Sequence, residues 1–86
     1  MKDGQAMPVR SVLRQLLARE NLRRAEAGEP FLTQQQISRD TGLPPSVINS
    51  LMMNKSQRVD FGTLGKLCSY FSVQPGDLLI YEEGEG

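Results

Sequence analysis

The sequence predicts an all-α domain built from five short helices. Apolar residues recur at helical spacing along most of the chain, and glycine or proline interrupts the pattern between segments. No stretch shows the signal of a β-hairpin, and no segment repeats. A chain of 86 residues forms one small domain. Its core must therefore be compact and largely helical, or be completed by a second copy of the chain.

The first helix is expected to begin at Val9, after residues 1–8, whose polar sequence predicts a flexible N-terminal arm. One apolar stripe at helical spacing supports it, formed by Val12, Leu13, Leu16 and Leu17. The helix should end before Gly28, because glycine adopts the left-handed capping conformation and Pro30 forces the preceding residue out of the α region.

The start of the second helix has the clearest local signal in the chain. Thr33 as N-cap places Gln36 at the third helical position, which predicts a capping box. Leu32 and Ile37 bracket this start as a hydrophobic staple. The helix should be short, because Gly42 provides a sharp turn directly after it.

A third helix is predicted to start almost at once, with Pro45 at its first position, where a missing amide hydrogen costs nothing. No breaker interrupts residues 46–53. Its inward face is expected to consist of Ile48, Leu51 and Met52.

Asp60 is expected to cap a fourth helix. Its apolar stripe comprises Leu64, Leu67, Cys68 and Phe71, which predicts a buried thiol at the single cysteine. Pro75 then suits the start of a fifth helix that ends near Ile80. The folded domain should thus span residues 9–81, followed by an acidic disordered tail at residues 82–86.

Composition excludes several classes of protein. The chain has no histidine and one cysteine, which argues against imidazole-based catalysis, a zinc finger and a disulfide framework. No nucleophile has a base beside it, so we expect no catalytic residue, no metal and no cofactor. No apolar run approaches the ~20 residues of a membrane span. We therefore expect a cytoplasmic protein without a small-molecule substrate.

The formal net charge of zero conceals an uneven distribution. Residues 1–58 carry nine Lys and Arg against five Asp and Glu, whereas residues 59–86 carry one against five. Local positive charge is what a phosphate-binding face requires. The same distribution is also compatible with ordinary solvated surface and an acidic solubilising tail.

A short helix, a tight turn and a second short helix form a helix-turn-helix, whose second helix can enter the DNA major groove. The segments that match a known pattern in order and spacing are residues 32–38, 41–43, 46–51, 59–64, 67–68 and 74–79. With them the chain resembles the Xre-type family of Cro and phage-repressor relatives over residues 9–81, in its compact single-domain bacterial branch. The resemblance implies a compact five-helix, lambda-repressor-like domain with its recognition helix at about residues 44–53.

The chain departs from this family pattern in two places. Residues 23–31 look like an insertion between the first and second helices, which could lengthen the first helix or contact a protein. After the recognition helix, a frequent Asn-Gly is replaced by Met53 and Asn54. Asn54 still tolerates a left-handed cap, whereas Met53 cannot make the phosphate contact of the family's asparagine.

The residues expected to read bases share the outward face of the third helix; they are Pro45, Ser46, Asn49, Ser50 and Met53. The amide of Asn49 can pair with adenine through two hydrogen bonds. The two serines can reach phosphates or either base, and Pro45 or Met53 can touch a thymine methyl group. The alternative is ordinary helix surface.

The residues expected to bind phosphate are Gln34, Arg39, Lys55 and Arg58. Gln34 matches the family's glutamine that braces the DNA backbone, and it lies at a helix N-terminus, where free amides favour an anion. The three basic residues flank the same predicted surface, and Arg10 and Arg14 are weaker candidates.

These observations favour a sequence-specific DNA-binding transcriptional regulator, interpreted as a repressor, in a bacterial cytoplasm or phage-encoded and associated with the nucleoid. One module reads few base pairs, so we expect a homodimer on double-stranded DNA. Its dimer surface is expected at residues 79–81 with the fifth helix, or at residues 23–31. The alternative is an antitoxin-like or accessory module that uses the same fold to hold a protein partner.

Overall fold

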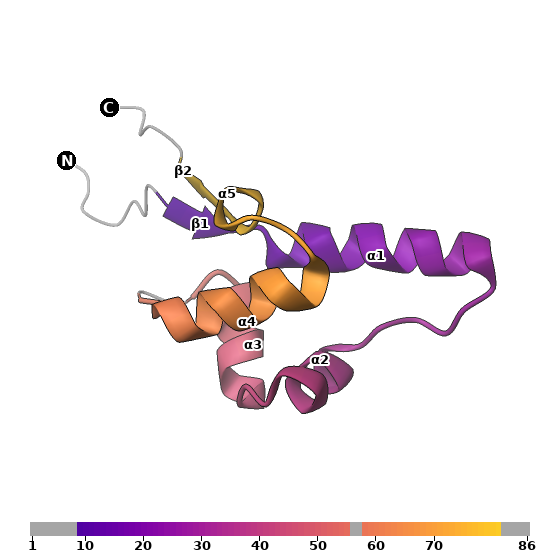
Figure 1. The fold of residues 1–86 in the computed structure, drawn as a ribbon, viewed down its shortest axis with the longest axis horizontal. Coiled ribbons are helices and arrows are strands. Elements are labelled where there is room, and N and C mark those ends of the chain that lie inside the picture. The colour runs from indigo at the N-terminus through magenta and orange to yellow at the C-terminus, as the bar shows by residue number, and fades with distance from the viewer. Residues whose placement is uncertain (1–8, 56–57, 82–86) are drawn as a thin grey trace.

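The structure is a computed structural model that describes residues 9–55 and 58–81. This part of the chain contains five helices and two short strands, which pair as an antiparallel ribbon (Figure 1). The elements are β1 Val9–Ser11, α1 Leu13–Ala27, α2 Gln34–Thr41, α3 Pro45–Met52, α4 Phe61–Phe71, α5 Pro75–Leu78 and β2 Leu79–Tyr81. The predicted arm at residues 1–8 and the predicted tail at residues 82–86 lie outside the described residues.

The ribbon corrects the predicted ends of two helices. α1 begins at Leu13 rather than Val9, and α5 ends at Leu78 rather than near Ile80. The residues left over pair antiparallel, with Val9 opposite Tyr81, Arg10 opposite Ile80 and Ser11 opposite Leu79. Branched and aromatic residues suit a strand, but a pairing between opposite ends of the chain leaves no local periodicity to detect. The all-α class stands, with one small sheet added.

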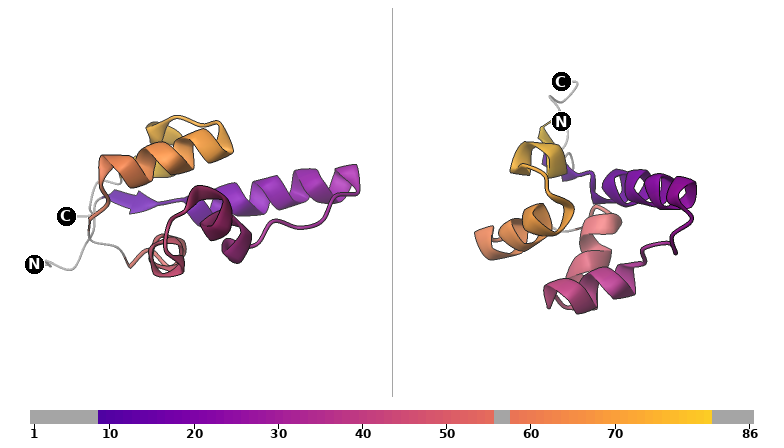
Figure 2. Two further views of the ribbon diagram at one scale, coloured as in Figure 1. Left: turned by 60° about the horizontal axis from the view of Figure 1, so that its bottom comes forward. Right: turned by 45° about the vertical axis from the view of Figure 1, so that its right-hand side comes forward.

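Each helix contributes one completely enclosed side chain to a single core. These side chains, each at most 1% exposed, are Leu13, Ile37, Ile48, Leu67 and Leu78. α3 lies against both α1 and α2, and α4 lies against both α2 and α5 (Figure 2). Met52 is buried in this core as predicted. Cys68 is only half-buried, because it packs at the margin of the core rather than inside it.

Helix ends follow the predicted caps with one correction. The Thr33 hydroxyl accepts a hydrogen bond from the Gln36 amide at 3.1 Å, and the Asp60 carboxylate accepts one from the Thr63 amide at 2.7 Å. Gly28 adopts the expected left-handed conformation, with φ 73°. The predicted capping box also requires the Gln36 side chain to accept a hydrogen bond from the backbone N–H of Thr33. This bond is not formed, because the Gln36 side chain donates to Asp40 instead.

The predicted insertion at residues 23–31 lengthens α1 and then returns along it as an extended segment (Figure 1). The Asn21 side chain fixes the returning chain by bonding both the N–H of Leu32, at 2.6 Å, and its C=O, at 3.0 Å. Arg24 donates to the C=O of Pro30 at 3.2 Å. These hydrogen bonds hold the segment against α1, so it has a defined position in the fold.

Candidate nucleic-acid interface

The turn between α2 and α3 is fixed by side chains of α2. The Ser38 hydroxyl donates to the C=O of Leu43 at 2.6 Å. The Thr41 hydroxyl donates to the C=O of Ile37 at 2.7 Å and accepts from the N–H of Leu43 at 3.2 Å. Gly42 reverses the chain with φ 77°, which a side chain would strain. These contacts set the direction in which α3 leaves α2.

α3 has one buried face and one open face. Ile48, Leu51 and Met52 are at most 6% exposed. At about 100° of rotation per residue, Ser46, Asn49, Ser50 and Met53 lie within one sector of about 100° that excludes the buried residues, whereas Pro45, at the first turn, lies about 20° from the direction of Met52. Pro45, Ser46, Asn49 and Met53 are exposed, and Ser50 is half-buried. The structure thus brings Ser46, Asn49, Ser50 and Met53 onto one outward surface, with Pro45 exposed at the border of that surface.

Hydrogen-bonding capacity on this surface is unused. Among the residues that the structure describes, no side chain partners the amide of Asn49 or the hydroxyls of Ser46 and Ser50. Elsewhere in the described chain, polar side chains such as Asn21, Gln36 and Asp40 are bonded within the protein. The outward face of α3 therefore offers donors and acceptors to an external ligand.

A hollow of about 270 Å³ adjoins this face. Its lining combines Ser46 and Ser50 from α3 with Arg58 and Asp60 from the segment before α4. The hydrogen bond from the Thr63 amide holds the pKa of Asp60 below its ordinary value, so this carboxylate stays charged in its capping role. Arg58 is the exposed cation that the fold places next to the two serines.

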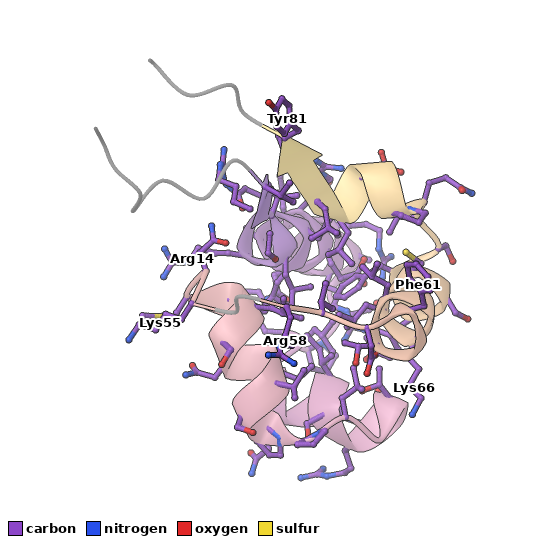
Figure 3. All side chains as sticks on the ribbon, turned by 90° about the vertical axis from the view of Figure 1, so that its left-hand side faces the viewer. Arg14, Lys55, Arg58, Phe61, Lys66 and Tyr81 are labelled. Atoms are coloured by element: carbon purple, nitrogen blue, oxygen red, sulfur yellow. The ribbon has the colours of Figure 1, made fainter. Side chains whose placement is uncertain are left out.

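The other predicted phosphate contacts are distributed more widely. Gln34, Arg39 and Lys55 are all exposed. Gln34 and Arg39 are five residues apart on α2, which separates their directions by about 140°, so the structure does not bring them onto one face. Figure 3 shows Arg14 and Lys55 pointing outward on the α3 side, and Phe61 and Lys66 on the α4 side.

The end of α3 is attached to the ribbon by Asn54, a contact that the sequence did not indicate. Asn54 has φ 60°, and its side chain accepts from the N–H of Ser11 at 3.0 Å and donates to the C=O of Ser11 at 3.4 Å. The signal available in the sequence was its tolerance of the left-handed conformation. Its second function as a link to β1 depends on the folded arrangement.

A second tie joins α2 to α4 and was also missed. The Tyr70 hydroxyl donates to one carboxylate oxygen of Asp40 at 2.7 Å, and the side-chain amide of Gln36 donates to the other oxygen at 2.7 Å. Burial, followed by the bond to Asp40, raises the pKa of Tyr70 to about 12. The bond from Tyr70, followed by that from Gln36, lowers the pKa of Asp40. α2, the helix that precedes the turn, is therefore attached to α4 through Asp40.

A family comparison decides what this arrangement is. Residues 13–84 match the Cro/C1-type HTH DNA-binding domain, which is most of the chain. The chain belongs to the Cro/C1-type HTH DNA-binding family. This confirms the predicted resemblance and the all-α helix-turn-helix fold class, and identifies a DNA-binding domain of a regulator whose partner is double-stranded DNA. No curated protein and no solved structure matched the chain.

Within residues 9–55 and 58–81, no three His, Cys, Asp or Glu side chains cluster in a way that could hold a metal ion. No helix in the same part of the chain combines the length and apolar character that crossing a membrane requires.

Proposed function

We propose that this protein is a sequence-specific transcriptional regulator that reads the DNA major groove with α3. The observation that carries the proposal is the outward face of α3, where hydrogen-bonding side chains have no partner in the described chain while the opposite face is buried. In a Cro/C1-type domain this is the face available to base edges. The proposed base-reading residues are Pro45, Ser46, Asn49, Ser50 and Met53.

Asn49 is the proposed main determinant of specificity. A carboxamide presents a donor and an acceptor together, which matches the N6 and N7 edge of adenine. Asn49 lies on the open face of α3 and is exposed. Ser46 and Ser50, beside the hollow, can hydrogen-bond bases or phosphates, and the apolar surface of Pro45 or Met53 suits a thymine methyl group.

The proposed phosphate contacts position this face on the duplex. Arg58 borders the hollow beside α3, Lys55 follows the helix, and Gln34 begins α2. Arg39, in the last turn of α2, is the fourth proposed contact. Phosphate contacts release counterions from DNA, so affinity should fall steeply as salt rises.

The proposed mode of action is repression by a homodimer. A single domain of this kind contacts too few base pairs to select one site in a genome, whereas two domains related by a two-fold axis read a pseudo-palindrome. Successive half-sites on one side of B-DNA are about 34 Å apart. A bound dimer that covers such a site blocks access by other proteins, which is the action of a repressor.

A second candidate function is an antitoxin-like or accessory module that holds a protein partner. The observation that favours it is a pair of exposed apolar side chains: Phe31, on the segment held in place after α1, is 66% exposed, and Leu22, on α1 itself, is 61% exposed. Exposed apolar side chains on ordered parts of the fold are suited to a protein contact. The zero net charge of the chain is compatible with such a role.

Titration of a random-sequence duplex at several salt concentrations separates the two functions. A regulator should bind the duplex, and the logarithm of its affinity should fall linearly with the logarithm of the salt concentration. Absence of duplex binding at low salt, together with a stable complex with the product of a neighbouring gene, would replace the regulator by the interaction module.

A further inference from the structure

Three exposed basic side chains near α3 lack an acidic partner. Arg14, Lys55 and Arg58 are exposed, and none of them forms an ion pair with a carboxylate among the residues that the structure describes. By contrast, the two arginines that bind Glu20 on α1 are neutralised. Arg14 and Lys55 point outward on the same side of the molecule (Figure 3). We call Arg14, Lys55 and Arg58 the cationic face.

The residues that follow β2 carry the opposite charge. The sequence of residues 82–86 is Glu-Glu-Gly-Glu-Gly, which contains three carboxylates and no basic residue. This acidic tail lies outside the described residues, but β2 fixes the point from which it leaves the fold. Tyr81, the last residue of β2, lies opposite Val9 on β1. The tail therefore starts from the ribbon to which the end of α3 is also attached.

Contacts of the ribbon set an upper limit on the distance between this starting point and the cationic face. Leu79 pairs with Ser11, and Ser11 bonds to Asn54, which directly precedes Lys55. At ordinary strand and peptide spacings, the path from Tyr81 through these residues to Lys55 is about 20 Å long, and the direct distance is shorter. Five residues span up to about 17 Å, and the glutamate and lysine side chains add to this reach. The carboxylates of the tail can therefore reach Lys55 of the same chain.

We propose that the acidic tail binds the cationic face when DNA is absent and competes with DNA phosphates for it. The carboxylates of Glu82, Glu83 and Glu85 would take the places that phosphate oxygens occupy in the complex. A short tether holds them at millimolar effective concentration. Each exposed ion pair is weak, so a duplex can displace the tail. The inference rests on the proposed function, because it assigns a second ligand to the proposed phosphate contacts Lys55 and Arg58.

Screening by salt gives this competition a measurable signature. Ion pairs between exposed groups weaken as salt rises, since the Debye length falls from about 10 Å at 0.1 M to about 3 Å at 1 M. The tail should therefore reduce DNA affinity at low salt and have little effect at high salt. The slope of log affinity against log salt should be shallower in wild type than in a variant with a neutral tail. The ratio of specific to random-duplex affinity should not change, because the tail competes for phosphate contacts and not for base contacts.

The test compares the full wild-type chain with the variant Glu82→Gln/Glu83→Gln/Glu85→Gln. In titrations of a random-sequence duplex, the variant should bind about three- to tenfold more tightly at low salt, and the two proteins should bind equally well near 0.5 M salt. Glu26→Gln is the matched control for Glu83→Gln, because each removes one carboxylate and Glu26 is exposed in the last turn of α1. Glu83→Gln should increase affinity, and Glu26→Gln should leave it unchanged.

Amide signals of ¹⁵N-labelled protein without DNA distinguish contact with the cationic face from simple repulsion between the tail and DNA. Signals of wild type and of the triple variant should differ at residues 13–15 and 54–58 at low salt and coincide at high salt. Equal duplex affinity of the two proteins at low salt, or amide differences restricted to the ribbon and the tail, would overturn the proposal. Failure of both proteins to bind duplex DNA would instead refute the proposed function, and the amide comparison would still test the contact.

Discussion

The carboxamide of Asn54 binds both backbone polar groups of Ser11, which joins the end of the recognition helix to the first strand. Asn54 sits two residues beyond α3 in the left-handed conformation, with φ 60°. Ser11 is buried, and its hydroxyl in turn accepts from the N–H of Leu13 at the start of α1. One side chain therefore connects the DNA-facing helix, the ribbon and the first helix.

Two substitutions of Asn54 should separate the contribution of its hydrogen bonds to Ser11 from that of its left-handed backbone conformation. Asn54→Gly retains the positive φ but loses the two bonds to Ser11, and should lower the free energy of unfolding by about 1–3 kcal/mol. Asn54→Ala loses the same bonds and strains the left-handed backbone, which should add about 1 kcal/mol. Urea unfolding of both variants measures the difference. Equal stability of Asn54→Ala and wild type would show that the link contributes nothing.

Asn49→Ala should reduce specificity rather than general DNA affinity. The variant loses the proposed bidentate contact with adenine, which should weaken the specific site by ~1–3 kcal/mol. Because Asn49 is exposed and bonds no other described side chain, stability should stay within about 0.5 kcal/mol of wild type. Titrations of the specific site and of a random duplex check this. An equal loss on both duplexes would remove Asn49 from the base-reading set.

Arg58→Ala should weaken binding to every duplex alike. Loss of one phosphate contact should reduce the slope of log affinity against log salt by about one. Lys66→Ala is the matched control, because Lys66 is also an exposed cation but lies on the α4 side (Figure 3). An unchanged slope for Arg58→Ala, or the same reduction for both variants, would contradict the assignment of Arg58.

Glu20 should make stability dependent on pH under acidic conditions. Hydrogen bonds from Arg23, at 2.9 Å, and from Arg24, at 2.8 Å, lower the pKa of Glu20 from 4.5 to about 2. A lowered carboxyl pKa stabilises the fold above the unfolded-state value, and this contribution is lost as the pH falls from 4.5 towards 2.

Asp40 and Asp60 also have lowered pKa values, so they contribute to the acid dependence of stability as well. Both residues are kept in Glu20→Gln, and the comparison of this variant with wild type therefore isolates the contribution of Glu20. The unfolding free energy of Glu20→Gln should decrease less than that of wild type over the acidic range. Parallel curves for the two proteins would show that the ion pairs of Glu20 do not contribute to stability.

Local features of the fold were predictable, and contacts between distant segments were not. Thr33, Asp60 and Gly28 act on their own helix ends, so the sequence around each residue is sufficient to assign its role. The ribbon and the bond from Tyr70 to Asp40 join segments far apart in the chain. Such pairings depend on packing, which single-stretch periodicity does not contain.

The candidate site likewise has one part that the sequence predicts and one part that depends on contacts between distant segments. Helical periodicity placed Ser46, Asn49 and Met53 on one outward face, and the structure confirms that placement. The hollow beside Ser46 and Arg58 could not be predicted, because it forms between α3 and the segment that leads into α4. The base and phosphate contacts themselves stay predictions.

The central claim is tested most directly by selecting duplexes from a random pool with the purified protein near physiological salt, and by sequencing those it retains. The account predicts enrichment of an inverted repeat whose half-sites are about one helical turn, or ~34 Å, apart. Retention without an enriched sequence would contradict sequence-specific reading by α3, and absence of retention would contradict DNA regulation altogether.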